Sequence, residues 1–159
     1  MSAKHRQLNF VVGHGLGSGS IAHEAVVSRP HGPPRVLIVD DLADAAGSLA
    51  KVVELTGMDA FVAHDGFEAV ELAQRLRPDL IFMDFSMPGL NGADAIARIR
   101  DALRGRTTPI CALVARGDWR TLETLRSVGC DHCLIKPAAM AEIDSILALL
   151  PRSHQLMTS

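Results

Sequence analysis

The sequence predicts an α/β domain, in which a parallel β-sheet is covered by helices on both faces. Two observations predict this class. Short apolar runs recur along residues 35–150, and segments with helical periodicity lie between them. The runs are almost continuously apolar rather than alternating, which is typical of parallel strands buried on both faces. At 159 residues, of which 48% are hydrophobic, the chain can bury one sizeable core.

Five segments are expected to be strands, because each is a short run rich in Val, Ile and Leu. In chain order they are residues 35–39 (RVLIV), 59–63 (DAFVA), 79–83 (DLIFM), 109–114 (PICALV) and 132–135 (HCLI).

Between these runs, apolar residues recur at every third or fourth position, which indicates helices with one apolar face. The pattern is clear in residues 45–53, 69–76, 96–103 and 140–150. It is weaker in residues 119–128, where Leu122 and Leu125 still fall on one side. The chain is therefore predicted to contain five βα units, with Asp44 as a favourable cap for the first helix.

The ends of the chain lack this regularity. Residues 1–34 are rich in Gly, Pro and His and are expected to form a flexible N-terminal extension. Residues 35–150 form the predicted domain, and residues 151–159 form a C-terminal tail. The apolar stretch at residues 10–12 is too short for a signal peptide, and no apolar run approaches the roughly 18 residues of a membrane helix. We expect a cytoplasmic protein without a membrane partner.

Charge and cysteine content exclude other classes. The formal net charge is −2, with arginines scattered among acids, so nucleic acid is not an expected partner. Three cysteines do not make a disulfide framework. Cys130, His132 and Cys133 invite comparison with a zinc or redox motif, but a closed zinc site needs four ligands. Cysteines buried in the core are the favoured interpretation.

Charged residues lie where three of the predicted strands end. Asp40 and Asp41 follow the first strand, Asp84 follows the third, and Lys136 with Pro137 follows the fifth. In open parallel sheets, ligands bind outside these carboxyl ends. Clustered carboxylates repel one another unless a cation lies among them. Oxygen ligands of this kind suit Mg²⁺, with Mn²⁺ possible.

Three motifs together resemble the receiver domain of bacterial two-component response regulators. They are VDD at 39–41, MDFSMPGLNG at 83–92 and KP at 136–137, in this order and spacing. The resemblance covers residues 35 to about 150. It implies a flavodoxin-like fold with strand order 2-1-3-4-5.

The resemblance also implies a chemistry for these residues. Asp84 would attack the phosphorus of a phosphohistidine on a histidine kinase or a histidine phosphotransfer protein and become an aspartyl phosphate. Asp41, Asp84 and the backbone carbonyl of Ser86 would hold Mg²⁺, and Asp40 would support the ion directly or through water. Lys136 would pair with the phosphoryl oxygens. Apart from this self-phosphorylation and self-dephosphorylation, no enzyme activity is expected.

Two switch positions depart from the resemblance. Receivers usually carry Thr or Ser at the end of the fourth strand, where this chain has Val114. They usually carry Tyr or Phe three residues before the lysine, where this chain has Cys133. Because both halves of the usual relay are absent, phosphorylation could be intact while its conformational readout is weak or takes another route.

Two alternatives remain open. The first is a receiver-like interaction module that works independently of phosphorylation, which Val114 and Cys133 favour. The second, less favoured, is a haloacid-dehalogenase-like phosphatase. Such phosphatases carry a second acid two residues after the nucleophile, and here that position is Ser86.

The partner surface follows from the expectation of a single-domain regulator, since the sequence shows no pattern of a second domain. Such a protein acts by protein–protein interaction, by dimerising or by phosphorelay. A downstream protein is expected at the face of the fourth helix and fifth strand. Arg116, Trp119 and Arg120 lie near that face, although Trp119 could equally pack against the fourth helix.

Overall fold

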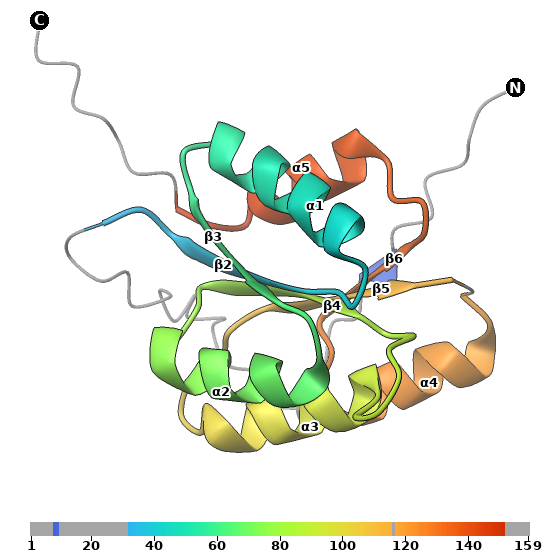
Figure 1. Cartoon of the computed structure of the whole chain (residues 1–159). Helices are drawn as coiled ribbons and strands as arrows, with labels where there is room; N and C mark the ends of the chain where they lie inside the picture. Colours follow the sequence, from blue (N-terminus) through green and yellow to red (C-terminus); the bar gives the residue numbers. More distant parts are fainter. Residues whose placement is uncertain (1–7, 10–31, 116, 152–159) are drawn as a thin grey trace, which may run out of the picture.

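The computed structural model describes residues 8–9, 32–115 and 117–151, with a sheet of parallel strands at its centre (Figure 1). These strands are β2 (Arg35–Val39), β3 (Asp59–Ala63), β4 (Leu80–Asp84), β5 (Ile110–Val114) and β6 (His132–Ile135). Their order in the sheet is β3-β2-β4-β5-β6. Counted among the parallel strands alone, this is the predicted order 2-1-3-4-5, so the predicted fold class is confirmed.

Two strands differ from the prediction by one residue at their ends. β4 begins at Leu80 rather than Asp79 and includes Asp84 as its last residue. β5 begins at Ile110, because the preceding Pro109 has no amide proton for the ladder. The helical pattern predicted the five helices but not their ends.

The helices cover the two faces of the sheet unequally (Figure 1). α1 (Ala43–Leu55) and α5 (Met140–Leu147) lie on one face, whereas α2 (Gly66–Leu76), α3 (Gly92–Ala102) and α4 (Trp119–Ser127) lie on the other. Loop side chains cap the N-termini of α2, α3 and α4. The capping residues are Asp65, Asn91 and Asp118, and each accepts a hydrogen bond from an amide in the first turn of its helix. These caps place the first turns of α2, α3 and α4 at the carboxyl edge of the sheet.

The prediction that Asp44 caps the first helix is wrong. α1 begins at Ala43, so Asp44 lies in the first turn, and the N-cap residue Leu42 makes no side-chain cap hydrogen bond. The loop is held instead by Asp40, whose Oδ1 accepts a hydrogen bond from the Leu42 amide at 2.9 Å. An acid in the first turn still interacts favourably with the helix dipole.

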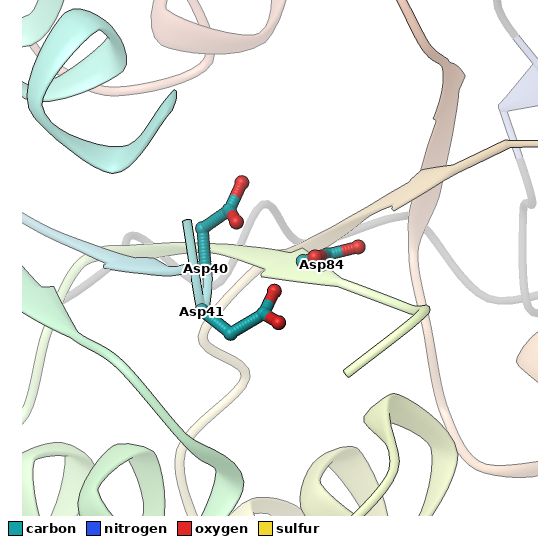
Figure 2. Close-up of side chains that lie close together, drawn as sticks. All are labelled: Asp40, Asp41 and Asp84. Atoms are coloured by element: carbon teal, nitrogen blue, oxygen red, sulfur yellow. The ribbon is translucent and has the colours of Figure 1, made fainter. Parts of the chain in front are cut away.

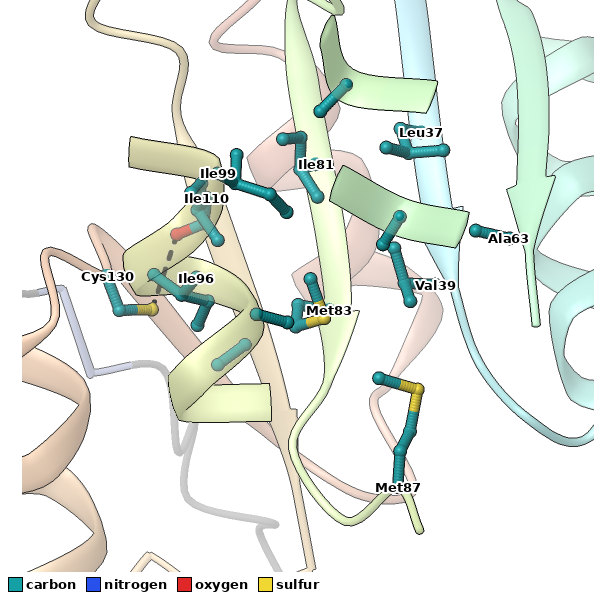
Figure 3. Packing of buried hydrophobic residues seen from close by; sticks show 14 of the residues in the cluster. Leu37, Val39, Ala63, Ile81, Met83, Met87, Ile96, Ile99, Ile110 and Cys130 are labelled. Atoms are coloured by element: carbon teal, nitrogen blue, oxygen red, sulfur yellow. Dashed lines mark hydrogen bonds between the residues drawn. The ribbon is translucent and has the colours of Figure 1, made fainter. Parts of the chain in front are cut away.

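Two apolar clusters form the core, one on each face of the sheet. Alternate residues of a strand point to opposite faces, so Leu37 and Ile81 join the cluster beneath α2 and α3, while Ile38 and Phe82 join the cluster beneath α1 and α5. Figure 3 shows the first cluster, in which Ile81 lies near Ile99. All residues of β4 and β5 are buried, which explains their continuous apolar sequence.

A short strand that the sequence analysis did not identify lies at the end of the sheet. β1 (Leu8–Asn9) pairs antiparallel with β6, and the Cα partners are Leu8 with Cys133 and Asn9 with His132. The rest of residues 1–31 and the tail from residue 152 lie outside the described residues, as does Arg116. Within the described part of the chain, none of the helices combines the length and the apolar character needed to cross a bilayer.

Candidate functional site

Three aspartates meet at the carboxyl edge of the sheet (Figure 2). Asp40 and Asp41 follow β2, and Asp84 ends the neighbouring strand β4. One carboxylate oxygen from each residue lies within 4.8 Å of the others. The sequence predicted this meeting, because parallel strands present their carboxyl ends at the same edge.

Asp84 is the most confined of the three, with a residue exposure of 2%. Its Oδ1 accepts two hydrogen bonds, one from Lys136 Nζ at 2.8 Å and one from the Ser86 amide at 3.1 Å. Among the described residues, both hydrogen bonds to this carboxylate go to Oδ1, which leaves Oδ2 as the oxygen available for an ion or a reacting group.

Lys136 reaches the cluster from the residue after β6. The Lys136 amide donates a hydrogen bond to the Val114 carbonyl at 2.8 Å, which continues the pairing of β6 with β5 beyond the last strand residue. The Lys136–Pro137 peptide bond is cis. The side chain is about one-third exposed, so its ammonium group borders both the buried Asp84 and solvent.

The environment of Asp40 disfavours its charged form. Burial is the largest cause that raises the pKa of this carboxyl, and the charges of Asp84 and Asp41 raise it further. The hydrogen bond from the Leu42 amide and the charge of Lys136 act in the opposite direction. A cation bound among the carboxylates would remove this cost, because it favours the charged form of every ligand.

The donor set fits a hard divalent cation. Three carboxylates with one ammonium leave excess negative charge, and all the side-chain ligands are oxygens, as Mg²⁺ requires. Ser86 lies at the same place, with its amide toward Asp84 and its side chain exposed. The role of its backbone carbonyl as a fourth ligand stays a prediction.

The two atypical positions are fully apolar. Val114 ends β5 with 1% exposure, and Cys133 lies in β6 with none. Both belong to the cluster beneath α2 and α3. Neither contributes a hydroxyl or a ring to the carboxyl edge, as their sequence predicted.

The cysteines are core residues. Cys111, Cys130 and Cys133 are free and buried, and burial raises the pKa of Cys130 to about 12 and that of Cys133 to about 11. The Cys130 thiol donates to the His132 carbonyl at 3.0 Å. Among the described residues, the three aspartates form the only group of His, Cys, Asp or Glu arranged to hold a metal. The zinc interpretation therefore receives no support.

The predicted partner residues are exposed where the structure describes them. Trp119 is 67% exposed, so it is not packed in the core, and the Arg120 guanidinium lies 5.3 Å from its ring centroid.

The sequence analysis missed two contacts of the acid cluster, which are the hydrogen bonds from the amides of Leu42 and Ser86. A backbone donor cannot be recognised from the type of residue.

Known proteins share both sequence and fold with this chain. Transcriptional regulatory protein PrrA of Mycobacterium tuberculosis is 36% identical over 127 residues, which cover 79% of this chain and 54% of PrrA. The DNA-binding response regulator MtrA of the same species is 36% identical over 109 residues, covering 69% of this chain and 46% of MtrA. This chain thus spans about half the length of the curated relatives it matches.

Solved structures show the same architecture. The chemotaxis protein CheY4 of Vibrio cholerae superposes with a TM-score of 0.71 at 26% identity, covering 76% of this chain and 100% of that chain. The receiver domain of the Francisella response regulator 1452 has a TM-score of 0.65 at 32% identity, covering 73% and 95%. Residues 36–148 match the family of the response regulator receiver domain. With this match over the whole α/β unit and the acid cluster at its carboxyl edge, the chain belongs to the receiver domain family of response regulators.

Proposed function

We propose that this receiver accepts a phosphoryl group on Asp84 from the phosphohistidine of a histidine kinase or a histidine phosphotransfer protein. The observation that carries the proposal is the surroundings of the Asp84 carboxylate. Its Oδ1 is held by Lys136 Nζ and the Ser86 amide, while Oδ2 accepts no hydrogen bond from the described residues, and the carboxylates of Asp40 and Asp41 lie close by. A nucleophile fixed in this way needs little reorganisation before attack.

The proposed step is a single phosphoryl transfer. The N–P bond of the phosphohistidine breaks as a bond forms between Asp84 Oδ2 and phosphorus, and the imidazole nitrogen leaves with the electron pair and takes up a proton. Lys136 moves from Oδ1 toward the phosphoryl oxygens, where its charge offsets theirs. Burial of Asp84 at the strand end keeps bulk water from competing with the donor.

A divalent cation completes this site. Asp40, Asp41, Asp84 and the Ser86 carbonyl would hold Mg²⁺, or Mn²⁺ in its place, and the ion would neutralise charge on the transferring group. Neither Asp40 nor Asp41 takes part in the bond changes of this step. Both would hold the cation, and the charge of the cation would offset the repulsion between their carboxylates.

A second candidate function is an interaction module that binds its partner independently of phosphorylation. Val114 and Cys133 favour it, since the buried valine and cysteine offer no hydroxyl or ring that could respond to a phosphoryl group. A population shift requires contacts that differ between two states. Ser86 in place of a second acid argues against a phosphatase, because no carboxylate is provided there to activate water.

The test of the first candidate is the intact mass of the purified protein after incubation with Mg²⁺ and acetyl phosphate. One added phosphoryl group is expected on the native chain and none on Asp84→Asn. Asp44→Asn is the matched control, because Asp44 is an exposed acid near the site but outside the cluster, and it should label normally. An unlabelled native chain would contradict the proposal.

The second candidate is tested by amide NMR spectra recorded before and after labelling. A working switch should shift amides in α4 and β6 as well as those next to Asp84. Shifts confined to residues 84–92 in a fully labelled sample would support the phosphorylation-independent module.

A further inference from the structure

Two buried glycines begin the helices that flank the loop after Asp84. Gly66 is the first residue of α2, and Gly92 is the first residue of α3. The loop from residue 85 to residue 91 runs between the end of β4 and Gly92, and its beginning carries the Ser86 amide that binds Asp84. Each glycine touches this loop, at opposite ends.

Gly92 lies against the start of the loop. A Cβ atom added there would be 2.7 Å from Phe85 Cα and 2.9 Å from the Asp84 carbonyl oxygen. Both are backbone atoms, so no side-chain rotation could relieve the contact. The strand end is itself tied down, because the Phe85 amide donates to the Leu113 carbonyl at 2.9 Å. Any side chain at residue 92 must therefore displace α3 or the backbone that carries Asp84.

Gly66 lies against the end of the same loop. A Cβ atom there would be 2.7 Å from the Leu90 carbonyl oxygen and 3.0 Å from Leu90 Cβ. Leu90 is buried in the cluster beneath α2 and α3, so it cannot swing out to make room without losing its packing. The N-terminus of α2 thus packs against Leu90, the residue before Asn91, which caps α3.

Among the described glycines, only Gly66 and Gly92 have backbone atoms within 3.0 Å of an added Cβ, whereas the near atom at Gly117 is the end of the Ile135 side chain, at 2.7 Å. A Cβ at Gly47, within α1, would meet nothing within 4 Å, and the same holds at Gly89 in the middle of the loop. Gly89 has a φ of +79°, so glycine is favoured there by backbone conformation rather than by space.

We propose that Gly66 and Gly92 are positioning residues, which hold the two ends of loop 85–91 so that Ser86 stays aligned with the Asp84 carboxylate. The inference rests on the proposed function at Asp84. The absence of a Cβ lets α3 sit directly on the Asp84–Phe85 peptide and lets α2 sit on Leu90. The carboxyl edge is thereby braced from the helices, in addition to the hydrogen bonds of the strands.

The test compares labelling of Asp84 by acetyl phosphate across a series of Mg²⁺ concentrations. We expect Gly92→Ala to lower the labelling rate by about ten- to a hundredfold, since a misplacement of about 1 Å can cost this much. The Mg²⁺ concentration for half-maximal labelling should rise as well, because the Ser86 carbonyl moves with the loop. Gly66→Ala should show the same changes more weakly, as it acts at the far end.

Gly47→Ala is the matched control. It makes the same substitution in α1, on the other face of the sheet, where an added Cβ would meet nothing within 4 Å, and alanine favours helix. This variant should label like the native chain and unfold at an equal or higher temperature. Circular dichroism of each variant separates a displaced loop from a lost fold.

The outcomes are distinct. A native chain that fails to label defeats the proposed function, whereas a folded Gly92→Ala that labels like the native chain at every Mg²⁺ concentration overturns the inference about the glycines. If the alanine variants do not fold, hydrogen exchange of the native chain decides. Mg²⁺ should then slow amide exchange in the first turns of α2 and α3 together with residues 84–86, and slowing confined to residues 84–86 would overturn the inference.

Discussion

Aspartates lie at both edges of the sheet, but their charges are handled in opposite ways. At the amino edge, Asp79 precedes β4 and Asp131 precedes β6, and each is paired with an arginine. At the carboxyl edge, three aspartates share one lysine. The same side chain in the same kind of position therefore serves two different purposes.

The amino edge is a closed set of partners. Asp131 Oδ2 accepts from the Ile110 amide at 2.8 Å and pairs with Arg100, whose guanidinium also donates to the carbonyls of Gly129 and Thr108. Asp79 Oδ2 accepts from the Arg35 amide at 2.8 Å. Asp79 and Asp131 are therefore both paired with an arginine and hydrogen-bonded to a backbone amide, which is what a partly buried ion pair needs to be stabilising.

The carboxyl edge is left incomplete by the chain itself. Its carboxylates outnumber the cations, and burial with neighbouring acids raises the pKa of Asp40. A purely structural pair of buried acids would be compensated like Asp79 and Asp131, each of which has its own arginine. The contrast teaches that uncompensated charge, rather than the presence of aspartate, marks the place where a ligand is expected.

The largest expected effect separates the two edges by one matched pair of substitutions. Asp41→Asn should lower Mg²⁺-dependent labelling by about a hundredfold, because losing one charged ligand contact costs roughly 2–3 kcal/mol. Asp79→Asn should label normally and lose about 1 kcal/mol of stability, since its pairing with Arg106 is weakened. Rates come from mass spectrometry and stabilities from urea unfolding. Equal losses of labelling in both variants would mean that the edges do not act separately.

The next effect is on stability alone. Arg100→Ala should lower the free energy of unfolding by about 2 kcal/mol, because Asp131 and two carbonyls lose their donor. Arg104→Ala is the control, since its pair with Asp101 is 81% and 68% exposed and should contribute less than about 0.5 kcal/mol. Urea unfolding measures both. Comparable losses from the two arginines would show that the amino-edge network is not the stabilising element that its geometry indicates.

The carboxyl edge was largely predictable from sequence, and the amino edge was not. The sequence predicts that Asp40, Asp84 and Lys136 lie close together, because each follows a recognisable strand and parallel strands end at one edge. Arg100 and Asp131 are 31 residues apart, and nothing in the pattern of either segment indicates their contact. Their pairing depends on how α3 packs, which periodicity does not specify.

Local details of the site show the same division. The cap of α1 was wrongly given to Asp44, because a capping residue is recognised only relative to the first helical residue, and α1 starts at Ala43. The burial of Val114 and Cys133 agreed with their apolar character. The contacts of Gly66 and Gly92 with loop 85–91 could not be read from sequence, because they arise from the approach of two helices to one loop.

The smallest expected effect concerns the stability cost of the uncompensated edge. Without a metal, Asp40→Asn should raise the free energy of unfolding at pH 7 by about 0.5–1 kcal/mol, because it removes a charge whose burial is unfavourable. The pKa of Asp40 is higher in the folded state than its ordinary value of 3.8. The native carboxylate therefore destabilises the fold increasingly as the pH rises from 3.8 through the raised pKa of the folded state. The advantage of Asp40→Asn should accordingly shrink as the pH falls toward 4.

With Mg²⁺ present, the native chain should become more stable than Asp40→Asn. An ion that binds only the folded state stabilises it, and the native chain retains all three carboxylates to bind it. Urea unfolding at pH 5 and pH 7, with and without Mg²⁺, therefore gives four comparisons of the native chain with Asp40→Asn. A variant that is less stable than the native chain at pH 7 without the ion would show that Asp40 is compensated like the acids of the amino edge, and the distinction between the two edges would fail at that residue.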